Sequence, residues 1–298
     1  MATCIAWLLN LDADLELQDP ASYHAPRITA QRVAELSARM ADLIAADDVV
    51  LTDTWRGPLR ADCVLQLFCP TPNALARVTA LGLTPGPAPS LAVLRGVNSR
   101  SFCAALGHGL PGSAYVLDMA ALEQQLQRAS VTGSYVLKRE FSFAGREQRR
   151  VHGSSLDAAT RSFCARSFAR GEGLQVEPWV QRLADFSRHG YLTRTGVLLM
   201  GSTREQRCDA HGRFLGMSVA PAEVSPAEAA ALAAELTKTS AALAAAGYFG
   251  PFGIDGFRYA QVEGGEAFNP RCEINGRFTM GYPRALLQDA LDRESAAL

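Results

Sequence analysis

Alternation of apolar and polar side chains is sharpest near the end of the chain, over residues 266–281 (EAFNPRCEINGRFTMG). Because successive side chains of a strand point to opposite faces, Phe268, Cys272 and Ile274 should form one apolar face. The other face of this predicted strand is polar and consists of Asn269, Arg271, Glu273, Asn275 and Arg277. A carboxylate and an amide oxygen two residues apart suit Mg²⁺, and the guanidinium groups beside them suit phosphate oxygens. A solvated edge strand gives the same alternation, so other segments must decide between the two interpretations.

Strands and helices alternate over roughly the first hundred residues, which is typical of a small α/β domain with a parallel sheet. The pattern predicts strands at residues 4–10, 49–52 and 63–68, and helices at 28–46, 72–81 and 91–106. Residues 83–90 (LTPGPAPS) are rich in Pro and Gly and read as a connection.

The order of elements changes after this first part of the chain. Residues 186–200 and 213–219 alternate and are joined by polar turns, which predicts antiparallel strands. An Ala-rich helix over residues 227–246 then leads to a strand at 253–260 and to the polar strand near the end. The remaining predictions are strands at 114–117, 134–138 and 175–180 and helices at 119–129 and 158–170.

Composition narrows the class of protein without naming a function. With 298 residues the chain exceeds the usual single core, so two or three subdomains are expected. The chain is 48% hydrophobic and 20% charged, as in ordinary soluble proteins, and a net charge of -1 offers no basic field for nucleic acid or membrane. The N-terminus lacks a basic region before its short apolar run, and charges interrupt the Ala-rich helix, so neither a signal peptide nor a membrane span is predicted.

The seven cysteines are odd in number and scattered, with no C-x-x-C motif. This spacing argues against a disulfide framework and against a structural zinc site. A protein without disulfides suits a reducing compartment. The sequence therefore predicts a cytoplasmic location.

Lysine is rare in this chain, because only Lys138 and Lys238 accompany the arginines among its 29 basic side chains. Lys138 ends a predicted strand and precedes a polar, glycine-containing loop over residues 142–150 (SFAGREQRR). An ammonium group beside such a loop can contact a phosphate, with the loop N–H groups closing over the oxygens. An exposed strand end is the alternative.

Two further segments carry candidate chemistry. The stretch 177–180 (EPWV) contains Pro178, which cannot donate to a sheet ladder, so we expect an edge or crossover where free backbone groups beside Trp179 hold an adenine. A tryptophan packed in a core is the alternative. Asp255 lies in a strand expected to neighbour that of Glu273, and two such carboxylates repel unless a cation sits between them. The pairing favours a metal site.

Taken in order, these segments resemble the ATP-grasp superfamily of ligases. The resemblance covers residues 114–298, and its most specific parts are GIDGF at 253–257 and EINGR at 273–277. It implies an α/β protein in which two α+β subdomains clasp ATP behind a Rossmann-like N-terminal domain. The implied units are residues 1–108, residues 109–182 and residues 183–298.

The resemblance also implies a nucleotide site. Lys138 matches the lysine on the ATP phosphates, and Arg100 stands where a second phosphate-binding residue is expected. The mobile loop over the phosphates would be residues 142–146, and Asp185 would contact the ribose. The predicted loop contacts are Ser142, Gly145 and Arg146, and the adenine would pair with Glu177, Pro178, Trp179 and Val180.

The remaining implied roles concern metal and catalysis. Asp255, Glu273 and Asn275 match the residues that hold Mg²⁺, with Mn²⁺ as the alternative ion. Arg277 matches an arginine that steadies an acyl phosphate, and Arg271 joins it and Lys138 in the predicted catalytic group. The arginine that D-alanine ligases carry two residues before their aspartate is Gly253 here, which argues against that subfamily.

The implied reaction activates a carboxylate with ATP as an acyl phosphate, which an amine then attacks to release phosphate. A kinase that phosphorylates a hydroxyl and a protein that binds ATP without turnover stay open as alternatives. A protein that only binds ATP would need fewer site residues than this chain has, because Lys138, Asp255, Glu273, Asn275 and Arg277 are all present. The expected partners are ATP, a small carboxylate and an amine, with no nucleic acid or membrane, and a homodimer would be in keeping with the superfamily.

Overall fold

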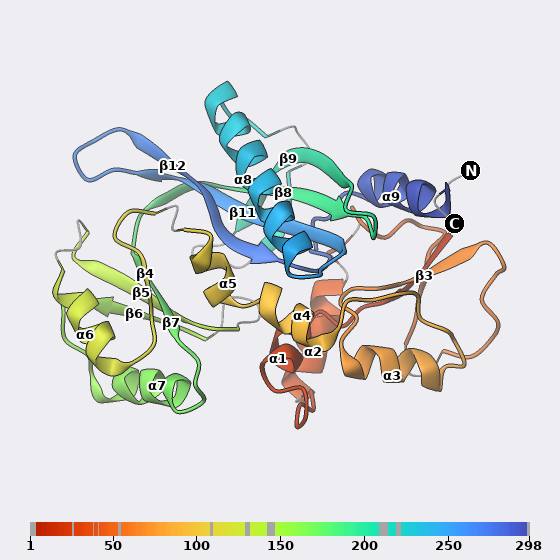
Figure 1. Cartoon of the computed structure of the whole chain (residues 1–298), viewed down its shortest axis with the longest axis horizontal. Coiled ribbons are helices and arrows are strands. Elements are labelled where there is room, and N and C mark those ends of the chain that lie inside the picture. Colours follow the sequence, from red (N-terminus) through yellow and green to blue (C-terminus); the bar gives the residue numbers. More distant parts are fainter. Residues whose placement is uncertain are drawn as a thin grey trace.

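The computed structural model describes residues 4–25, 27–37, 39–40, 42–52, 55–107, 110–128, 132–141, 147–208, 214–218 and 222–296. These residues form three sheets, of three, four and five strands. In Figure 1 the four-stranded sheet with its two helices makes the lobe at the left, and the three-stranded sheet lies at the right. The long helix α8 (Pro226–Ala245) runs across the strands of the five-stranded sheet.

The N-terminal sheet has the order β2-β1-β3, and both pairings are parallel, as predicted. Its strands are β1 (Cys4–Leu8), β2 (Val49–Val50) and β3 (Cys63–Leu67), accompanied by helices α1 (Ala13–Gln18), α2 (Arg27–Ser37) and α3 (Pro72–Ala80). The predicted helix over residues 28–46 is therefore too long. Met40 and Leu43, within that range, are buried, but they lie in turns and irregular chain after α2 and not in a helix.

One disulfide corrects the expectation drawn from the cysteine spacing. Cys4 and Cys63 are direct partners in the register of β1 and β3, with their Cα atoms 4.4 Å apart, and their sulfur atoms are bonded. Parallel pairing of strands far apart in sequence brings the two together, which spacing alone cannot reveal. The cysteines thus no longer argue for a reducing compartment.

The predicted helix over residues 91–106 is two helices, α4 (Leu91–Val97) and α5 (Arg100–Ala105). The interruption lies at Asn98, whose side chain makes two hydrogen bonds to the main chain of Gly276. Its Oδ1 accepts from Gly276 N at 2.8 Å, and its Nδ2 donates to Gly276 O at 3.2 Å. Ser99 then caps α5 by accepting a hydrogen bond from Phe102 N. The break places Arg100 beside Glu273 in the last strand of the chain.

The four-stranded sheet is antiparallel, with the order β4-β7-β5-β6. Its elements are β4 (Ala114–Val116), α6 (Met119–Gln127), β5 (Ser134–Arg139), β6 (Gln148–His152), α7 (Ala158–Phe168) and β7 (Leu174–Pro178). β7 is an interior strand, so the prediction of an edge is wrong for most of it. The pairing with the short β4 ends at Val176, however, so Pro178 lies beyond the reach of that neighbour.

The five-stranded sheet is antiparallel throughout, in the order β10-β9-β8-β11-β12. Its strands are β8 (Arg182–Leu192), β9 (Leu198–Cys208), β10 (Phe214–Met217), β11 (Gly250–Ala260) and β12 (Glu266–Asn275), and helix α9 (Arg284–Ala296) follows. The predicted strand at residues 186–200 is divided by a turn in which Gly196 has a φ of 83°. Among the described residues no helix is long and apolar enough to cross a membrane.

A bulge in β12 changes which way its side chains face. Asp255 pairs with Glu273, but Phe257 pairs with Asn269, so Gly256 alone opposes residues 270–272. A Cβ on Gly256 would lie 2.7 Å from Asn269 O and 3.0 Å from Pro270 O. The strands can approach this closely only because residue 256 is glycine.

We expect Gly256→Ala to lower the free energy of unfolding by about 1–3 kcal/mol, since the added methyl group must push the bulge aside. Guanidinium denaturation measures the change. Gly96→Ala in α4 is the matched control, because no described residue outside its own stretch of helix comes within 4 Å of its Cβ position, and it should be neutral or stabilising. Equal stability of Gly256→Ala and the wild-type protein would contradict the close approach.

Candidate active site

A cavity of about 1070 Å³ opens where the three sheets meet. Its lining includes Asp14 from α1, Lys138 from β5, Asp255 from β11 and Glu273 from β12. Pockets for one small molecule usually have volumes of ~300–1,000 Å³, so this cavity has room for a nucleotide and a second ligand.

Asp255 and Glu273 face each other in the strand register, as the sequence predicts for neighbouring strands. Asp255 accepts hydrogen bonds from Ser187 Oγ at 2.5 Å, Gln206 Nε2 at 2.6 Å and Asn275 Nδ2 at 3.1 Å. Burial, followed by the charge of Glu273, raises the pKa of Asp255 to about 6. The hydrogen bonds to Asp255 lower its pKa, but they do not outweigh burial and the charge of Glu273.

Glu273 has the opposite balance. Burial alone would raise its pKa, but the charges of Arg100, Lys138 and Arg277 outweigh burial and hold the pKa below its ordinary value. Arg100 Nη2 lies 3.2 Å from Glu273 Oε1, and Arg100 Nε donates to Arg139 O at 2.9 Å. Glu273 therefore stays ionised next to a carboxyl group that burial makes hard to ionise.

This arrangement fits a divalent cation. Among the described residues no three His, Cys, Asp or Glu side chains gather at one point, but Mg²⁺ beside a nucleotide needs only one or two carboxylates because phosphate oxygens and water complete its shell. A cation between Asp255 and Glu273 would relieve the unfavourable ionisation of Asp255. Asn275 donates its Nδ2 to Asp255 here, so it offers its oxygen to a cation only after an amide flip.

Two further cations at the cavity are each held by a carboxylate of their own. Lys138 Nζ lies 2.6 Å from Glu177 Oε2, and both side chains are buried. Arg277 donates to Asp14 through Nη2 at 2.5 Å and Nε at 3.1 Å. An anionic ligand in the cavity thus meets cationic groups whose positions are already fixed, which is how preorganised phosphate sites are built.

Glu177, Pro178, Trp179 and Val180 all line the cavity. Trp179 is half-buried, and the guanidinium group of Arg150 lies 4.6 Å from the centre of its ring. The ring is therefore not packed inside a core, the alternative left open by the sequence. Burial would raise the pKa of Glu177, but the charge and hydrogen bond of Lys138, together with the charges of Arg182 and Arg100, outweigh burial and hold that pKa below its ordinary value.

Asp185 also lines the cavity, where it accepts a hydrogen bond from Arg182 Nη1 at 2.8 Å. The guanidinium group of Arg182 lies 4.0 Å from the centre of the Phe257 ring. Carboxylate, guanidinium and ring stand side by side along one wall. Such a combination offers both a hydrogen-bond acceptor and a flat apolar surface to a ligand.

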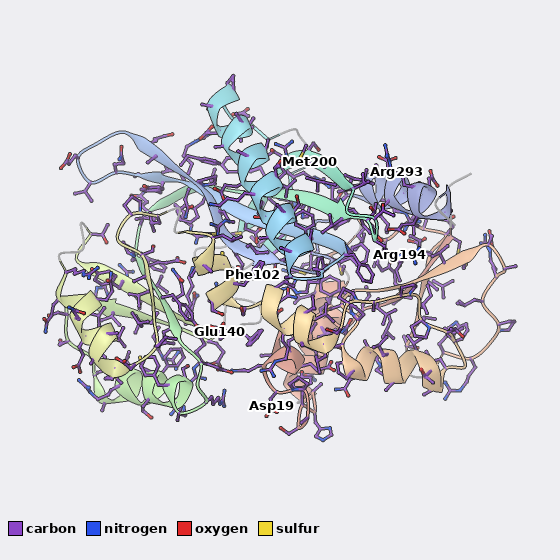
Figure 2. All side chains as sticks on the ribbon, in the orientation of Figure 1. Asp19, Phe102, Glu140, Arg194, Met200 and Arg293 are labelled. Carbon is purple, nitrogen blue, oxygen red and sulfur yellow. A yellow bond between two sulfur atoms is a disulfide. The ribbon has the colours of Figure 1, made fainter. Side chains whose placement is uncertain are left out.

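Glu140 joins the four-stranded sheet to α5 at the edge of the site, between the lobes in Figure 2. Its Oε1 accepts from Ser101 N at 3.2 Å, its Oε2 accepts from the Tyr115 hydroxyl, and Arg100 N donates to its main-chain oxygen. These bonds fix the start of α5, and with it the position of Arg100.

Arg271 corrects a prediction, because it is not among the residues that line the cavity. Its side chain is buried on the other face of β12, where it donates to Glu235 Oε2 at 2.8 Å, Cys103 O at 2.7 Å and Gly107 O at 2.8 Å. The bulge opposite Gly256 breaks the alternation on which the prediction rested. Cys272 accordingly packs with Phe257 instead of sharing the face of Ile274.

The predicted loop residues Ser142, Gly145 and Arg146 lie outside the described residues. The cavity residues that sequence reasoning did not identify include Ser187, Gln206 and Asp14. Ser187 and Gln206 are polar residues on antiparallel strands, a common surface pattern, and only the strand order puts them beside Asp255. Asp14 follows the first strand among other acidic residues, so its partner Arg277 could not be inferred from spacing.

Comparison with solved structures identifies the fold. D-cycloserine synthetase DcsG aligns with a TM-score of 0.55 at 14% identity, covering 99% of this chain and 100% of that one. D-alanyl-alanine synthetase A from Vibrio cholerae gives 0.52 at 12% identity, with 98% and 94% covered. N5-carboxyaminoimidazole synthetase from Staphylococcus aureus, complexed with ADP, gives 0.50 at 11% identity, with 94% and 71% covered.

The chain has the ATP-grasp fold. No protein-family model matches it, and no curated protein matches it in sequence. Identities this low establish the shared fold and leave the subfamily undetermined. Within this ATP-grasp fold, the His189 ring occupies the side-chain direction of Gly253, because a Cβ atom on Gly253 would lie 3.0 Å from His189 Cδ2. No larger residue fits there without displacing His189.

Asp255 makes the stability of the metal-free protein depend on pH. Because its pKa is about 6 when folded and 3.8 as the reference value, its contribution is fully present below pH ~4 and is lost as pH rises through 6, about 3 kcal/mol in all. Asp255→Asn removes this loss, so the variant should gain stability over the wild-type protein between pH 4 and pH 8.

Denaturation in a metal chelator at both pH values measures that gain. Asp289→Asn on α9, an exposed position, is the control and should show no such difference. A constant difference between Asp255→Asn and the wild-type protein at the two pH values would contradict the raised pKa.

Proposed function

We propose that this protein is an ADP-forming ligase that activates a small carboxylate with ATP and joins it to an amine. The observation that carries the proposal is the pair Asp255 and Glu273, opposed in a cavity with Arg100, Lys138 and Arg277 around Glu273. Two carboxylates for a cation and three cationic groups for phosphate oxygens are what phosphoryl transfer requires. The similar structures support this choice, since their names are those of synthetases and one of them holds ADP.

In the proposed site, Asp255, Glu273 and Asn275 hold Mg²⁺, or Mn²⁺ in its place. The bound ion supplies neutralisation of charge on the transferring phosphoryl group. The main chain of residues 177–180 pairs with the adenine, and Asp185 contacts the ribose. Ser142, Gly145 and Arg146 belong to the loop that covers the phosphates.

The proposed reaction has two steps. A carboxylate oxygen of the substrate bonds to the γ-phosphorus as the bond to ADP breaks, and the amine nitrogen then attacks the acyl carbon. The carbon–oxygen bond to phosphate breaks with its electron pair, and the amine loses a proton. Lys138 and Arg100 stabilise negative charge on the phosphoryl oxygens, and Arg277 holds the acyl phosphate, so positioning and electrostatics supply most of the catalysis.

We also propose that residues 1–108, residues 109–182 and residues 183–298 are three structural units that meet at this cavity. The four-stranded sheet supports the middle unit because it has a hydrophobic cluster of its own, which includes Leu122, Leu137 and Phe163. The proposed boundary between the second and third units falls at the start of β8, which runs from Arg182 to Leu192.

Hydroxylamine tests the proposal directly, because it traps any acyl phosphate as a hydroxamate whatever the natural amine is. Mg·ATP, hydroxylamine and small carboxylic acids added in turn should give hydroxamate, ADP and phosphate. ADP formed with a phosphorylated hydroxyl and no hydroxamate would establish a kinase instead. Binding of ATP without turnover in any mixture would contradict the ligase.

Glu273→Gln should reduce ATP-dependent hydroxamate formation by at least about 100-fold, since the amide removes the charge that holds the cation and keeps the shape of the side chain. Glu266→Gln is the control, an exposed carboxylate at the other end of the same strand. Near-normal turnover by Glu273→Gln, measured at saturating Mg²⁺, would remove Glu273 from the metal site.

Lys138→Met should weaken ATP binding by about tenfold or more, equivalent to ~1.4 kcal/mol, because a fixed charge beside the phosphates is lost. Lys238→Met is the matched control, since the other lysine of the chain is exposed on α8 and donates to Leu106 O. Calorimetry gives both affinities, and circular dichroism checks that the fold survives the unpairing of Glu177. Equal affinities in the two variants would exclude Lys138 from the phosphate site.

A further inference from the structure

The cavity has an apolar part that the proposed chemistry does not use. None of its residues comes from the four-stranded sheet; they come from the N-terminal part of the chain, from β10 and from the segment after β12. The members of this apolar wall are Leu11, Leu36, Phe68, Phe214, Met217 and Met280. Apolar groups that line a ligand cavity favour an apolar part of the ligand, because they remove it from water.

The apolar wall adjoins Arg277 through the ring of Phe68. The guanidinium carbon of Arg277 lies 5.6 Å from the centre of the Phe68 ring, and Phe278 N donates to Phe68 O at 3.1 Å. Arg277 is thus held between the Asp14 carboxylate on one side and an aromatic ring on the other. A ligand carboxylate that reaches this guanidinium places its own substituent beside Phe68.

Direct contacts between distant segments fix the shape of the wall. Arg39 Nη1 donates to Phe214 O at 3.2 Å, and Asp42 lies 3.3 Å from Arg204, so the chain after α2 is tied to β9 and β10. A Cβ on Gly281 would overlap Met217, whose Cγ lies 2.6 Å from that position. Met217 therefore lies against bare main chain, and the wall is formed before any ligand binds.

We propose that the carboxylate substrate carries an apolar side chain of about the size of leucine, methionine or phenylalanine, and that the apolar wall selects it. The inference rests on the proposed function and adds the substrate class. A polar side chain of equal size would lose its hydrogen bonds with water against these six residues and gain none from their apolar side chains. Arg207, a charged residue that also lines the cavity, is exposed on β9 and stays available to solvent.

The first test uses the wild-type protein, Mg·ATP and hydroxylamine, with both enantiomers of leucine, methionine, phenylalanine, asparagine, aspartate and lysine as carboxylates. Leucine and asparagine are close in size, so their comparison isolates polarity. We expect kcat/KM for hydroxamate formation to be at least tenfold higher with leucine than with asparagine.

The second test changes the wall. Met217→Gln keeps the length of the side chain and makes it polar, and it should lower the leucine-to-asparagine ratio of kcat/KM at least fivefold, through KM for leucine. Met200→Gln is the matched control: Met200 lies on β9 (Figure 2), is 49% exposed and is not among the residues that line the cavity. Its ratio should equal that of the wild-type protein.

The outcomes separate the inference from the function on which it rests. Hydroxamates formed preferentially from polar carboxylates would overturn the apolar selectivity and leave the ligase intact. An unchanged ratio in a folded Met217→Gln would likewise overturn the role of the wall. Absence of hydroxamate from every carboxylate, with ATP bound, would overturn the proposed function itself and the inference with it.

Discussion

The rest of the site depends on two half-buried carboxyl groups, Asp255 and Glu273, that face each other across β11 and β12. Burial, followed by the charge of Glu273, raises the pKa of Asp255, whereas neighbouring cations keep the pKa of Glu273 below its ordinary value. Ser187 and Gln206 hold Asp255 from one side, and Arg100 reaches Glu273 from another. The polar groups around the pair offset the unfavourable ionisation of Asp255 only in part. A cation bound between the two carboxylates would offset the remainder.

Two of the cationic groups at the cavity are each paired with a carboxylate. Lys138 is paired with Glu177 and Arg277 with Asp14, so these two charges enter the cavity already held in place by a carboxylate. Burying an ion pair gives little net stability, but it keeps the cation oriented. A phosphate then gains the attraction of a fixed charge without the entropy cost of ordering a long side chain. Because apolar residues in these places would stabilise the fold at least as well, the pairs are better explained by a role in binding.

Sequence reasoning recovers the parts of the fold that depend on local pattern. The parallel first sheet, the antiparallel strands and the opposition of Asp255 and Glu273 all follow from alternation and segment order. It fails for Arg271, because Arg271 lies in the bulge at residues 270–272, where the simple alternation of faces breaks down. The disulfide at Cys4 and the contacts of Ser187 are also missed, since both depend on which strands become neighbours across long stretches of chain.

The helix break at Asn98 has a mechanical consequence. Asn98 binds the main chain of Gly276 at both its N–H and its C=O, and a side chain on Gly276 would collide with Val97 Cγ2 at 2.6 Å. The start of α5 and the residue after β12 are therefore joined directly through main-chain groups. We expect any movement that admits or releases a ligand to occur elsewhere along the chain and to leave the distance between Arg100 and Glu273 unchanged.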